Sequence, residues 1–584
     1  MEISSIGRPR NVGWIRAAAL LYGDWGTSKA YVIGLGLAVA GFAALPHLLA
    51  VCALTALVGF NYIWICKHFP TGGGVYSSAG IHSRRLAMIG GLLLLADFIV
   101  TASLSCLDAF HYLGFAQAEA KKWAITAIFL IGLMNFFGPK HTGSIAVWFG
   151  LPTVLTVLAL IGAGLPHLAQ FHAQVPKGGV AENWVAFVGM ILALSGVEAA
   201  ASNTGVMRLD PSATPENPTV HGTSKRAIVV VMAEVVIGTG LLSVTAMCLP
   251  ADATHHQADL LRYMADIFVG RWFGHVVGIV FALLLLSAVN TAVTGMVSLI
   301  YVMARDGELP HPFTQLNGFG VPWVPLIMAT VLPVIVLNAE DSVEGLSHLY
   351  AIGVIGAIAI NIGSTAFART VDLALHERVV MKVTLIALTA VWLTIAITKL
   401  PALIFVTIVV GLGLVVREFT QRRQAAAPAP AVAPAQEPAA HLASAEPARL
   451  VFLGQFILVA ARGWTPGLQF ALEETRLRKA HLLVLYIREV AVTIDMGANW
   501  QNDPYARALF TRLERESQAM NVNKLYSISD SPADTIIDIA ATFGVDTVVL
   551  GGSRRAALVN LLKGNVVTRV AANLPESMHL IVVG

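Results

Sequence analysis

Two acidic residues could bind a cation, because each lies in an apolar stretch beside glycine and hydroxyl side chains. Asp24 belongs to the run Gly23-Asp24-Trp25-Gly26-Thr27-Ser28, and Glu198 follows Ser195-Gly196-Val197. A charge at the centre of a membrane-spanning helix costs roughly 2.5–3.5 kcal/mol on insertion scales, so a carboxylate there usually has a function. The glycines predict helices that unwind and turn free carbonyl oxygens toward a cation.

A third apolar stretch carries Asp97, Thr101 and Ser105. Residues four apart share one face of a helix, so these three side chains would form a further wall of the same site. The structural alternative is that such hydroxyls bond to their own backbone or to a neighbouring helix.

The donor types restrict the ligand. Carboxylate, hydroxyl and carbonyl oxygens suit an alkali cation or an amine, and a second carboxylate could carry a coupled proton. An amino acid would need backbone N–H groups for its carboxylate, and Asp24 has the wrong charge for that. No set of His and Cys ligands suggests a transition metal.

The composition requires lipid as the solvent of most of the chain. Of 584 residues, 56% are hydrophobic and 12% charged, which indicates a polytopic membrane protein. The net charge of +3 gives no reason to expect nucleic acid as a partner. We interpret the four cysteines as small apolar residues, and the first apolar stretch as a retained span.

Apolar runs of about 17–25 residues predict about twelve transmembrane helices. Spans one and six carry the two acids and would correspond in a five-plus-five inverted repeat, followed by two more helices. The expected spans are 14–40, 45–66, 88–115, 123–138, 143–166, 183–204, 226–249, 272–300, 323–338, 345–366, 380–398 and 400–416.

The distribution of Lys and Arg predicts that both termini are cytoplasmic. With this orientation only six basic residues of the membrane half lie outside: Lys121, Lys122, Lys177, Arg262, Arg271 and Lys399.

The chain is predicted to have three parts: a transporter domain at 1–420, an Ala/Pro-rich linker at 421–448 and a cytosolic α/β domain at 449–584. In the last part short apolar runs alternate with amphipathic stretches, which predicts a parallel sheet with helices on both faces. The expected strands are Val451–Ala460, Leu482–Ile487, Leu525–Ile528, Thr547–Leu550 and His579–Val583.

The membrane half resembles the KUP and KimA potassium importers of the amino acid–polyamine–organocation (APC) superfamily. The resemblance rests on Tyr22 to Tyr31, on Phe69-Pro70-Thr71-Gly72-Gly73-Gly74-Val75-Tyr76, and on Asp97 to Thr101. It continues in Gly196-Val197-Glu198-Ala199, in Ala304-Arg305-Asp306-Gly307-Glu308-Leu309-Pro310 and in Leu349-Tyr350-Ala351-Ile352-Gly353. The Phe-Pro-x-Gly-Gly and Ala-Arg-Asp-Gly elements are shared with amino acid permeases, whereas Asp24 with Tyr31 points to potassium.

The resemblance implies a LeuT-like fold and a potassium site that couples to protons, in the inner membrane of a bacterium. The implied cation site comprises Asp24, Tyr31, Thr101, Ser105, Ser195 and Glu198, with potassium at Asp24, Thr101 and Glu198 and with Tyr350 as a gate. Two positions depart from the family: Phe98 replaces a tyrosine and Ser195 replaces a threonine.

The C-terminal part resembles universal-stress-protein domains through Leu550-Gly551-Gly552-Ser553-Arg554-Arg555 and Leu562-Lys563-Gly564-Asn565-Val566. The resemblance implies a nucleotide or cyclic dinucleotide at Gly551, Arg554, Gly564 and Asn565, and a homodimer. Arg554, Asn565 and Arg462 depart from the family pattern.

The first hypothesis is therefore a potassium/proton symporter, which is not an enzyme and needs no cofactor, regulated through its cytosolic domain. An amino acid or polyamine permease of the same superfamily is the alternative, and a membrane-tethered nucleotide sensor is a third.

Overall fold

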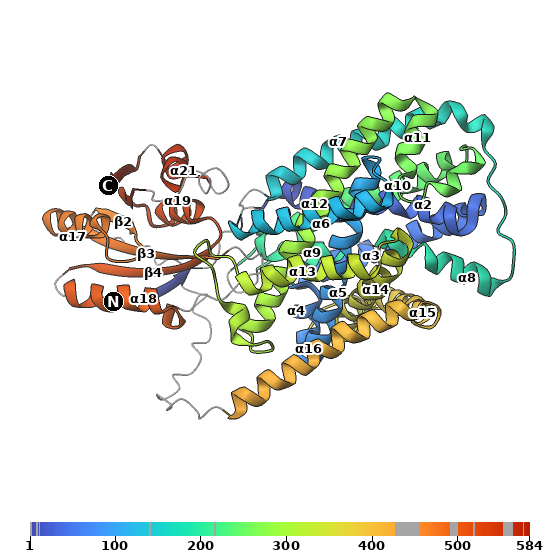
Figure 1. Cartoon of the computed structure of the whole chain (residues 1–584). Helices are drawn as coiled ribbons and strands as arrows, with labels where there is room; N and C mark the ends of the chain where they lie inside the picture. Colours follow the sequence, from blue (N-terminus) through green and yellow to red (C-terminus); the bar gives the residue numbers. More distant parts are fainter. Residues whose placement is uncertain are drawn as a thin grey trace.

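The computed structural model describes residues 3–6, 10, 12–138, 142–194, 196–214, 218–426, 455–490, 500–517, 520–552, 564–575 and 577–584. They form a helical domain and a smaller α/β domain beside it (Figure 1). Ser195, Arg554 and most of the expected linker lie outside the described residues.

The helical domain is built from sixteen α-helices in the described ranges. They are α1 (Trp14–Trp25), α2 (Ser28–Ala40), α3 (Leu45–His68), α4 (Gly74–Gly80), α5 (Arg84–Tyr112), α6 (Gln117–Phe136), α7 (Thr142–Gly164), α8 (Val180–Gly189), α9 (Glu198–Ser202), α10 (His221–Ala246), α11 (Leu260–Phe268), α12 (Arg271–Arg305), α13 (Trp323–Ala339), α14 (Val343–Phe367), α15 (Leu375–Thr398) and α16 (Leu400–Ala426).

Nine helical segments of the described chain are long and apolar enough to cross a membrane, fewer than the twelve spans expected. The difference has a local cause in each of the other three expected spans. The fourth, α6, begins with the charged run Glu119 to Lys122, the sixth is broken between α8 and α9, and the ninth, α13, has only 17 residues. The last span, α16, extends to Ala426, so the first residues of the expected linker are helical.

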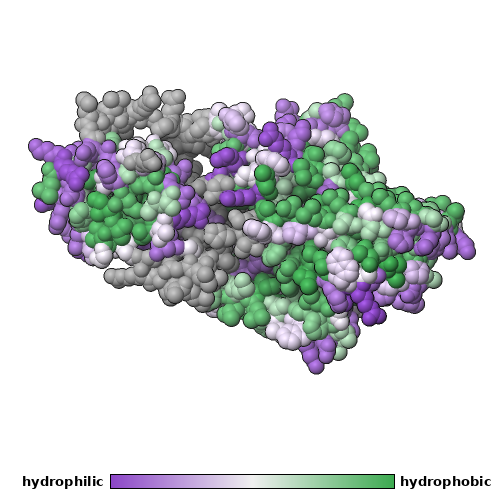
Figure 2. All heavy atoms as spheres, turned by 90° about the horizontal axis from the view of Figure 1, so that it is seen from above, coloured by the Kyte–Doolittle hydropathy of each residue, from purple (hydrophilic) through white to green (hydrophobic). Residues whose placement is uncertain are grey.

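Apolar side chains cover the outside of this domain, as a lipid environment requires. Figure 2 shows hydrophobic residues over much of its visible face. Leu400, Ile404, Ile408 and Leu412 recur every four residues on α16, and each is at least half exposed. The chain is therefore a membrane protein with a lipid-facing helical domain.

The α/β domain has a six-stranded sheet in the order β1-β4-β3-β2-β5-β6, and all of its strand pairs are parallel. The strands are β1 (Ile3–Ile6), β2 (Phe456–Ala460), β3 (His481–Glu489), β4 (Val522–Ser529), β5 (Thr547–Gly551) and β6 (His579–Val583). Two separate apolar clusters fill the two faces of the sheet. α17 (Pro466–Arg478) and α18 (Pro504–Glu516) cover one face, and α19 (Pro532–Phe543) and α21 (Val566–Asn573) cover the other. The predicted parallel sheet is confirmed.

The first strand comes from the opposite end of the chain, which the sequence did not predict. Ile3 to Ile6 pair in parallel register with Lys524 to Ser527, so β1 occupies the edge of the sheet beside β4. Ile3–Ile6 thus belong to the α/β domain, whereas Val12, shortly before α1, bridges to Met207 of the helical domain.

The two domains also touch through side chains. Tyr301 and Val302 at the end of α12 pack against Val490, which follows β3, and Leu316 joins the same cluster. We call this end of the helical domain the sheet side. Gly320 lies there with a positive φ of 80°, and a Cβ at this position would overlap the carbonyl of Glu489.

We expect Gly320→Val to separate these surfaces, because valine is strained at positive φ and its side chain would displace the end of β3. Hydrogen exchange should become faster at Tyr301 and Val490 and stay unchanged in β5. Gly318→Val is the matched control, since no atom lies within 4 Å of a Cβ built there. Equal protection in both variants would contradict the contact.

Candidate functional site

The two expected helix breaks lie directly against each other. The sixth span runs from α8 through a 3₁₀ turn at Ile191–Leu194 and Gly196 to α9, and Gly196 has a positive φ of 90°. A Cβ on Gly196 would overlap the backbone of Asp24 and Trp25. Only glycine allows both this conformation and this approach. The breaks of spans one and six, which the sequence pattern pairs with each other, are therefore in direct contact.

Gly196→Ala should disrupt this contact without changing any charge. The methyl group meets backbone atoms, which cannot rotate away, and the positive φ adds strain, so we expect a loss of about 1–3 kcal/mol in stability. Thermal unfolding of the detergent-solubilised protein measures it. Gly189→Ala in the same span is the control, because its Cβ would meet no atom within 4 Å. A wild-type melting temperature for Gly196→Ala would contradict this close packing.

The break in the first span is milder than the sequence suggested. α1 ends at Trp25 and α2 begins at Ser28, but Gly26 and Thr27 keep right-handed helical dihedrals. The Thr27 N–H and hydroxyl both donate to the carbonyl of Asp24, at 3.1 and 2.6 Å. The expected unwinding around Asp24 is thus limited to one turn, because Thr27 donates hydrogen bonds to the Asp24 carbonyl, which would otherwise be free at the break.

Tyr31 lies one turn after this break. Its hydroxyl is 3.1 Å from the Thr27 hydroxyl, and the side chain is buried. Tyr350 from α14 is also buried and interacts electrostatically with Asp24, Asp97 and Tyr31. The structure therefore brings the predicted gate residue to the same interior group as the first span.

Asp97, Thr101 and Ser105 are all buried and follow one another at four-residue intervals along α5. On α5, the Thr101 hydroxyl donates to the Asp97 carbonyl at 2.9 Å and approaches the Asp97 carboxylate at 3.3 Å. Ser105 is buried one turn further along, and its hydroxyl has no hydrogen-bond partner in the described part of the chain. The Thr101 hydroxyl thus bonds to the backbone of its own helix, as the structural alternative expected, and also contacts the Asp97 carboxylate.

Asp24, Asp97 and Glu198 are all buried and interact electrostatically with one another. One Asp24 carboxylate oxygen has no hydrogen-bond partner among the described residues, whereas the Asp97 carboxyl group lies beside Tyr350, Thr101 and Glu198 as possible partners. One Glu198 oxygen accepts from the Gly196 N–H at 3.2 Å. Within the described ranges no three His, Cys, Asp or Glu side chains converge as metal ligands.

Sequence reasoning did not place Tyr62 and Asn361 beside this group. Tyr62 on α3 is buried and interacts electrostatically with Glu198, and the Asn361 amide on α14 donates to its hydroxyl at 3.3 Å. The Ser78 hydroxyl on α4 donates to Asn361 at 2.7 Å. A polar chain therefore leads from the acids to α4, and single Tyr and Asn residues in apolar spans gave no spacing signal for it.

An ion pair between a buried lysine and a partly exposed glutamate, next to the first break, was also missed. Lys29 is fully buried, and its ammonium donates to Glu234 of α10 at 2.8 Å, to the Gly26 carbonyl at 3.2 Å and to the Tyr22 hydroxyl at 3.3 Å. All three ammonium protons thus have acceptors. The two residues lie 205 positions apart, so no local spacing indicates that they pair.

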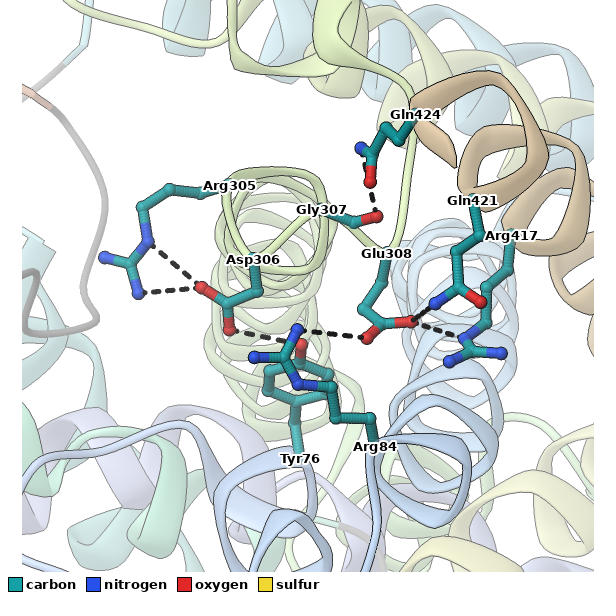
Figure 3. Close-up of polar contacts among 9 residues, drawn as sticks. All are labelled: Tyr76, Arg84, Arg305, Asp306, Gly307, Glu308, Arg417, Gln421 and Gln424. Carbon is teal, nitrogen blue, oxygen red and sulfur yellow. Dashed lines mark hydrogen bonds and ion pairs between the residues drawn. The ribbon is translucent and has the colours of Figure 1, made fainter. Parts of the chain in front are cut away.

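The Ala304–Pro310 motif closes the sheet side of the bundle (Figure 3). Glu308 is buried and pairs with Arg417 of α16, while Gln421 donates to the same carboxylate at 3.3 Å. Asp306 accepts from the Tyr76 hydroxyl at 3.1 Å. The motif therefore ties the end of α12 to α4 and to the last helix.

The predicted nucleotide residues of the α/β domain have local structural roles where they are described. Gly551 ends β5, and Gly564 has a positive φ of 73°. The Asn565 side chain caps α21 by accepting from the Val567 N–H at 2.9 Å. Arg462 pairs with Glu489. These contacts neither supply nor exclude a phosphate site.

Phe98, which replaces the family tyrosine, is buried on α5. A Cβ on Gly295 of α12 would approach its ring to 2.9 Å. The ring thus fills space against α12.

Comparisons with known proteins agree with this architecture. Residues 12–435 match the amino acid permease family, and residues 465–581 match the universal stress protein family. The potassium transporter KimA of Bacillus subtilis is 24% identical over 359 residues, 58% of this chain and 58% of that protein. The probable potassium transport system protein Kup 1 of Agrobacterium fabrum is 31% identical over 173 residues, 26% of this chain and 27% of that protein. The L-asparagine permease of Escherichia coli is 21% identical over 290 residues, 46% of this chain and 56% of that protein. The chain therefore spans less than two thirds of the length of each of these relatives.

Proposed function

The chain belongs to the amino acid permease family, and we propose that it is a member that imports potassium coupled to protons. The observation that carries the proposal is the buried carboxylate of Asp24, which has an unpartnered oxygen at the contact of the two helix breaks. An uncompensated anion in a dry interior favours a cation as its ligand. The names of two relatives, KimA and Kup 1, agree with potassium.

In this proposal Asp24 binds the ion directly, and the hydroxyls of Tyr31, Thr101, Ser105 and Ser195 complete its shell. Potassium would lie among Asp24, Thr101 and Glu198, with Tyr350 as the gate. We include Asp97 among the residues of the site because it is buried and interacts electrostatically with Asp24.

Coupling of potassium to protons would follow from the presence of three buried acids, Asp24, Asp97 and Glu198, in one group. Three buried carboxyl groups that interact with one another cannot all stay ionised without counter-charge. Either a cation or a proton has to compensate them, so loading of one would alter the binding of the other. Glu198 is the proposed ligand or proton carrier.

The test uses the full chain in proteoliposomes with an inward proton gradient. We expect potassium to accumulate, and a protonophore to abolish the accumulation. Amino acids and polyamines at millimolar concentration should not compete. Uptake of a labelled amino acid without potassium flux would overturn the proposal.

That contrary result would support the second candidate, an amino acid or polyamine permease. The observation that favours it is the similarity to the L-asparagine permease.

We also propose that the α/β domain regulates transport from the cytoplasm. Its contact with the end of α12 and its place in the chain support this role. Both termini would be cytoplasmic in a bacterial inner membrane, and two chains would form a homodimer. A nucleotide or cyclic dinucleotide would bind near Gly551, Arg554, Gly564 and Asn565. In the third alternative, a nucleotide sensor, the ligand would bind without any flux.

A further inference from the structure

A groove of about 470 Å³ opens on the outside of the helical domain between α14, α15 and the start of α5. Leu86, Ile360, Phe367 and Leu385 form its apolar walls, and His82 and Ser364 add polar groups. Its volume lies in the range of about 300–1,000 Å³ that is typical of ligand sites. The groove is separate from the acids of the transport site.

The groove runs along the helices in the direction of a lipid acyl chain. Its lining on α14 extends from Phe367, the last residue of that helix, to Ala359. Eight residues of α-helix span about 12 Å. Half of the hydrocarbon core of a bilayer is about 15 Å thick. Val383 and Ile386 on α15 are exposed, so the groove is continuous with the lipid-facing surface.

Polar groups gather at the sheet-side end of this groove. The ammonium of Lys382 is exposed and lies 5.1 Å from the centre of the Phe367 ring. The Ser364 side chain is buried, and its hydroxyl has no hydrogen-bond partner among the described residues. A helical serine that does not bond to its own backbone keeps a donor for another molecule.

A second contact holds the serine in place. The imidazole Nε2 of His82 is 2.7 Å from the Ser364 carbonyl, which leaves the Ser364 hydroxyl outside this hydrogen bond. The loop before α5 is thereby fixed against the end of α14. The polar end of the groove is thus built from two helices and the loop that joins α4 to α5.

We propose that this groove binds one anionic phospholipid of the sheet-side leaflet. An acyl chain lies against Ile360, Leu385 and Phe367. The Ser364 hydroxyl donates to an ester carbonyl of the lipid, and the Lys382 ammonium pairs with its phosphate. Lysines near the membrane–water interface attract anionic lipids in this way.

The experiment measures retained lipid by native mass spectrometry of the full chain, after reconstitution with phosphatidylglycerol or with phosphatidylcholine. The wild type should keep one phosphatidylglycerol and lose phosphatidylcholine. Lys382→Gln should lower retention about fivefold, since one basic residue near the surface contributes about that factor. Lys225→Gln is the control, because it removes another exposed lysine, on α10, that does not line the groove.

A second variant tests the acyl site separately from the charge. Ala359→Phe places a ring in the deep end of the groove and should reduce retention of phosphatidylglycerol. Val331→Phe enlarges an exposed residue of α13 and should not. Thermal unfolding checks folding: phosphatidylglycerol should raise the melting temperature of the wild type and of both controls, and should raise that of Lys382→Gln by a smaller amount. Wild-type retention in both groove variants would overturn the proposal, as would equal retention of the two lipids.

Discussion

Potassium uptake should be lost in Asp24→Asn while the protein remains folded. The amide has nearly the shape of the carboxylate, so it keeps the packing against Gly196 but removes the negative charge. Truncating a buried charged partner costs roughly 2–5 kcal/mol of binding free energy. Because each 1.4 kcal/mol is a factor of ten, we expect uptake at limiting potassium to fall at least tenfold, and about a hundredfold at 3 kcal/mol. Proteoliposomes with defined internal potassium measure it.

Asp108→Asn is the matched control for this experiment. Asp108 is also a fully buried carboxyl group with unpartnered oxygens, but it lies near the end of α5, 4.0 Å from His111. We expect its uptake to stay within about twofold of the wild type. If Asp24→Asn transports as well as Asp108→Asn, the cation site is not at Asp24. Loss of uptake in both variants would indicate a general need for buried acids.

Lys29→Met should be among the most destabilising single changes in the helical domain. It removes the ammonium and leaves Glu234 without its cationic partner, although Glu234 still accepts from the Tyr22 hydroxyl at 3.1 Å. Removing one member of a fully buried ion pair costs about 3–5 kcal/mol. The Glu234 side chain is 18% exposed, so we expect the cost at Lys29 to lie at or below the lower end of that range. Thermal unfolding in detergent should show a melting temperature several degrees lower, or no folded protein.

The double variant Lys29→Met/Glu234→Leu separates the charge from the packing. With both charges removed, apolar side chains of similar size should restore most of the stability. Lys121→Met provides the surface control. Lys121 pairs with the half-exposed Asp341 at 3.0 Å, and loss of such a pair costs at most about 1 kcal/mol. A double variant as unstable as Lys29→Met would mean that Lys29 acts through packing.

The sequence predicted the parts of the site that follow a local rule. The spacing of Asp97, Thr101 and Ser105 fixed their common face, because helical geometry alone determines it. Gly196 beside Glu198 predicted a break, and the structure has a positive φ there. The assignment of these residues to a cation remains a prediction.

Contacts between distant segments could not be predicted in the same way. Lys29 and Glu234 lie 205 residues apart, and no periodicity links them. The mild first break depends on Thr27, whose hydroxyl could equally have faced a ligand. The sequence of the α/β domain predicted its strands, because a buried parallel strand is a continuous apolar run. β1 has only four residues, Ile3-Ser4-Ser5-Ile6, and carries no such signal.

The position of β1 constrains the order in which the molecule can fold. Its partner strand lies more than 500 residues later in the chain. At about 5–20 residues per second, the ribosome needs roughly 25 to 100 s to make the intervening polypeptide. The first residues must therefore wait while the spans insert, and the sheet edge closes only after synthesis has reached β4. The segment made first therefore pairs with a strand made near the end of synthesis. The sheet can be completed only if both segments lie on the same side of the membrane.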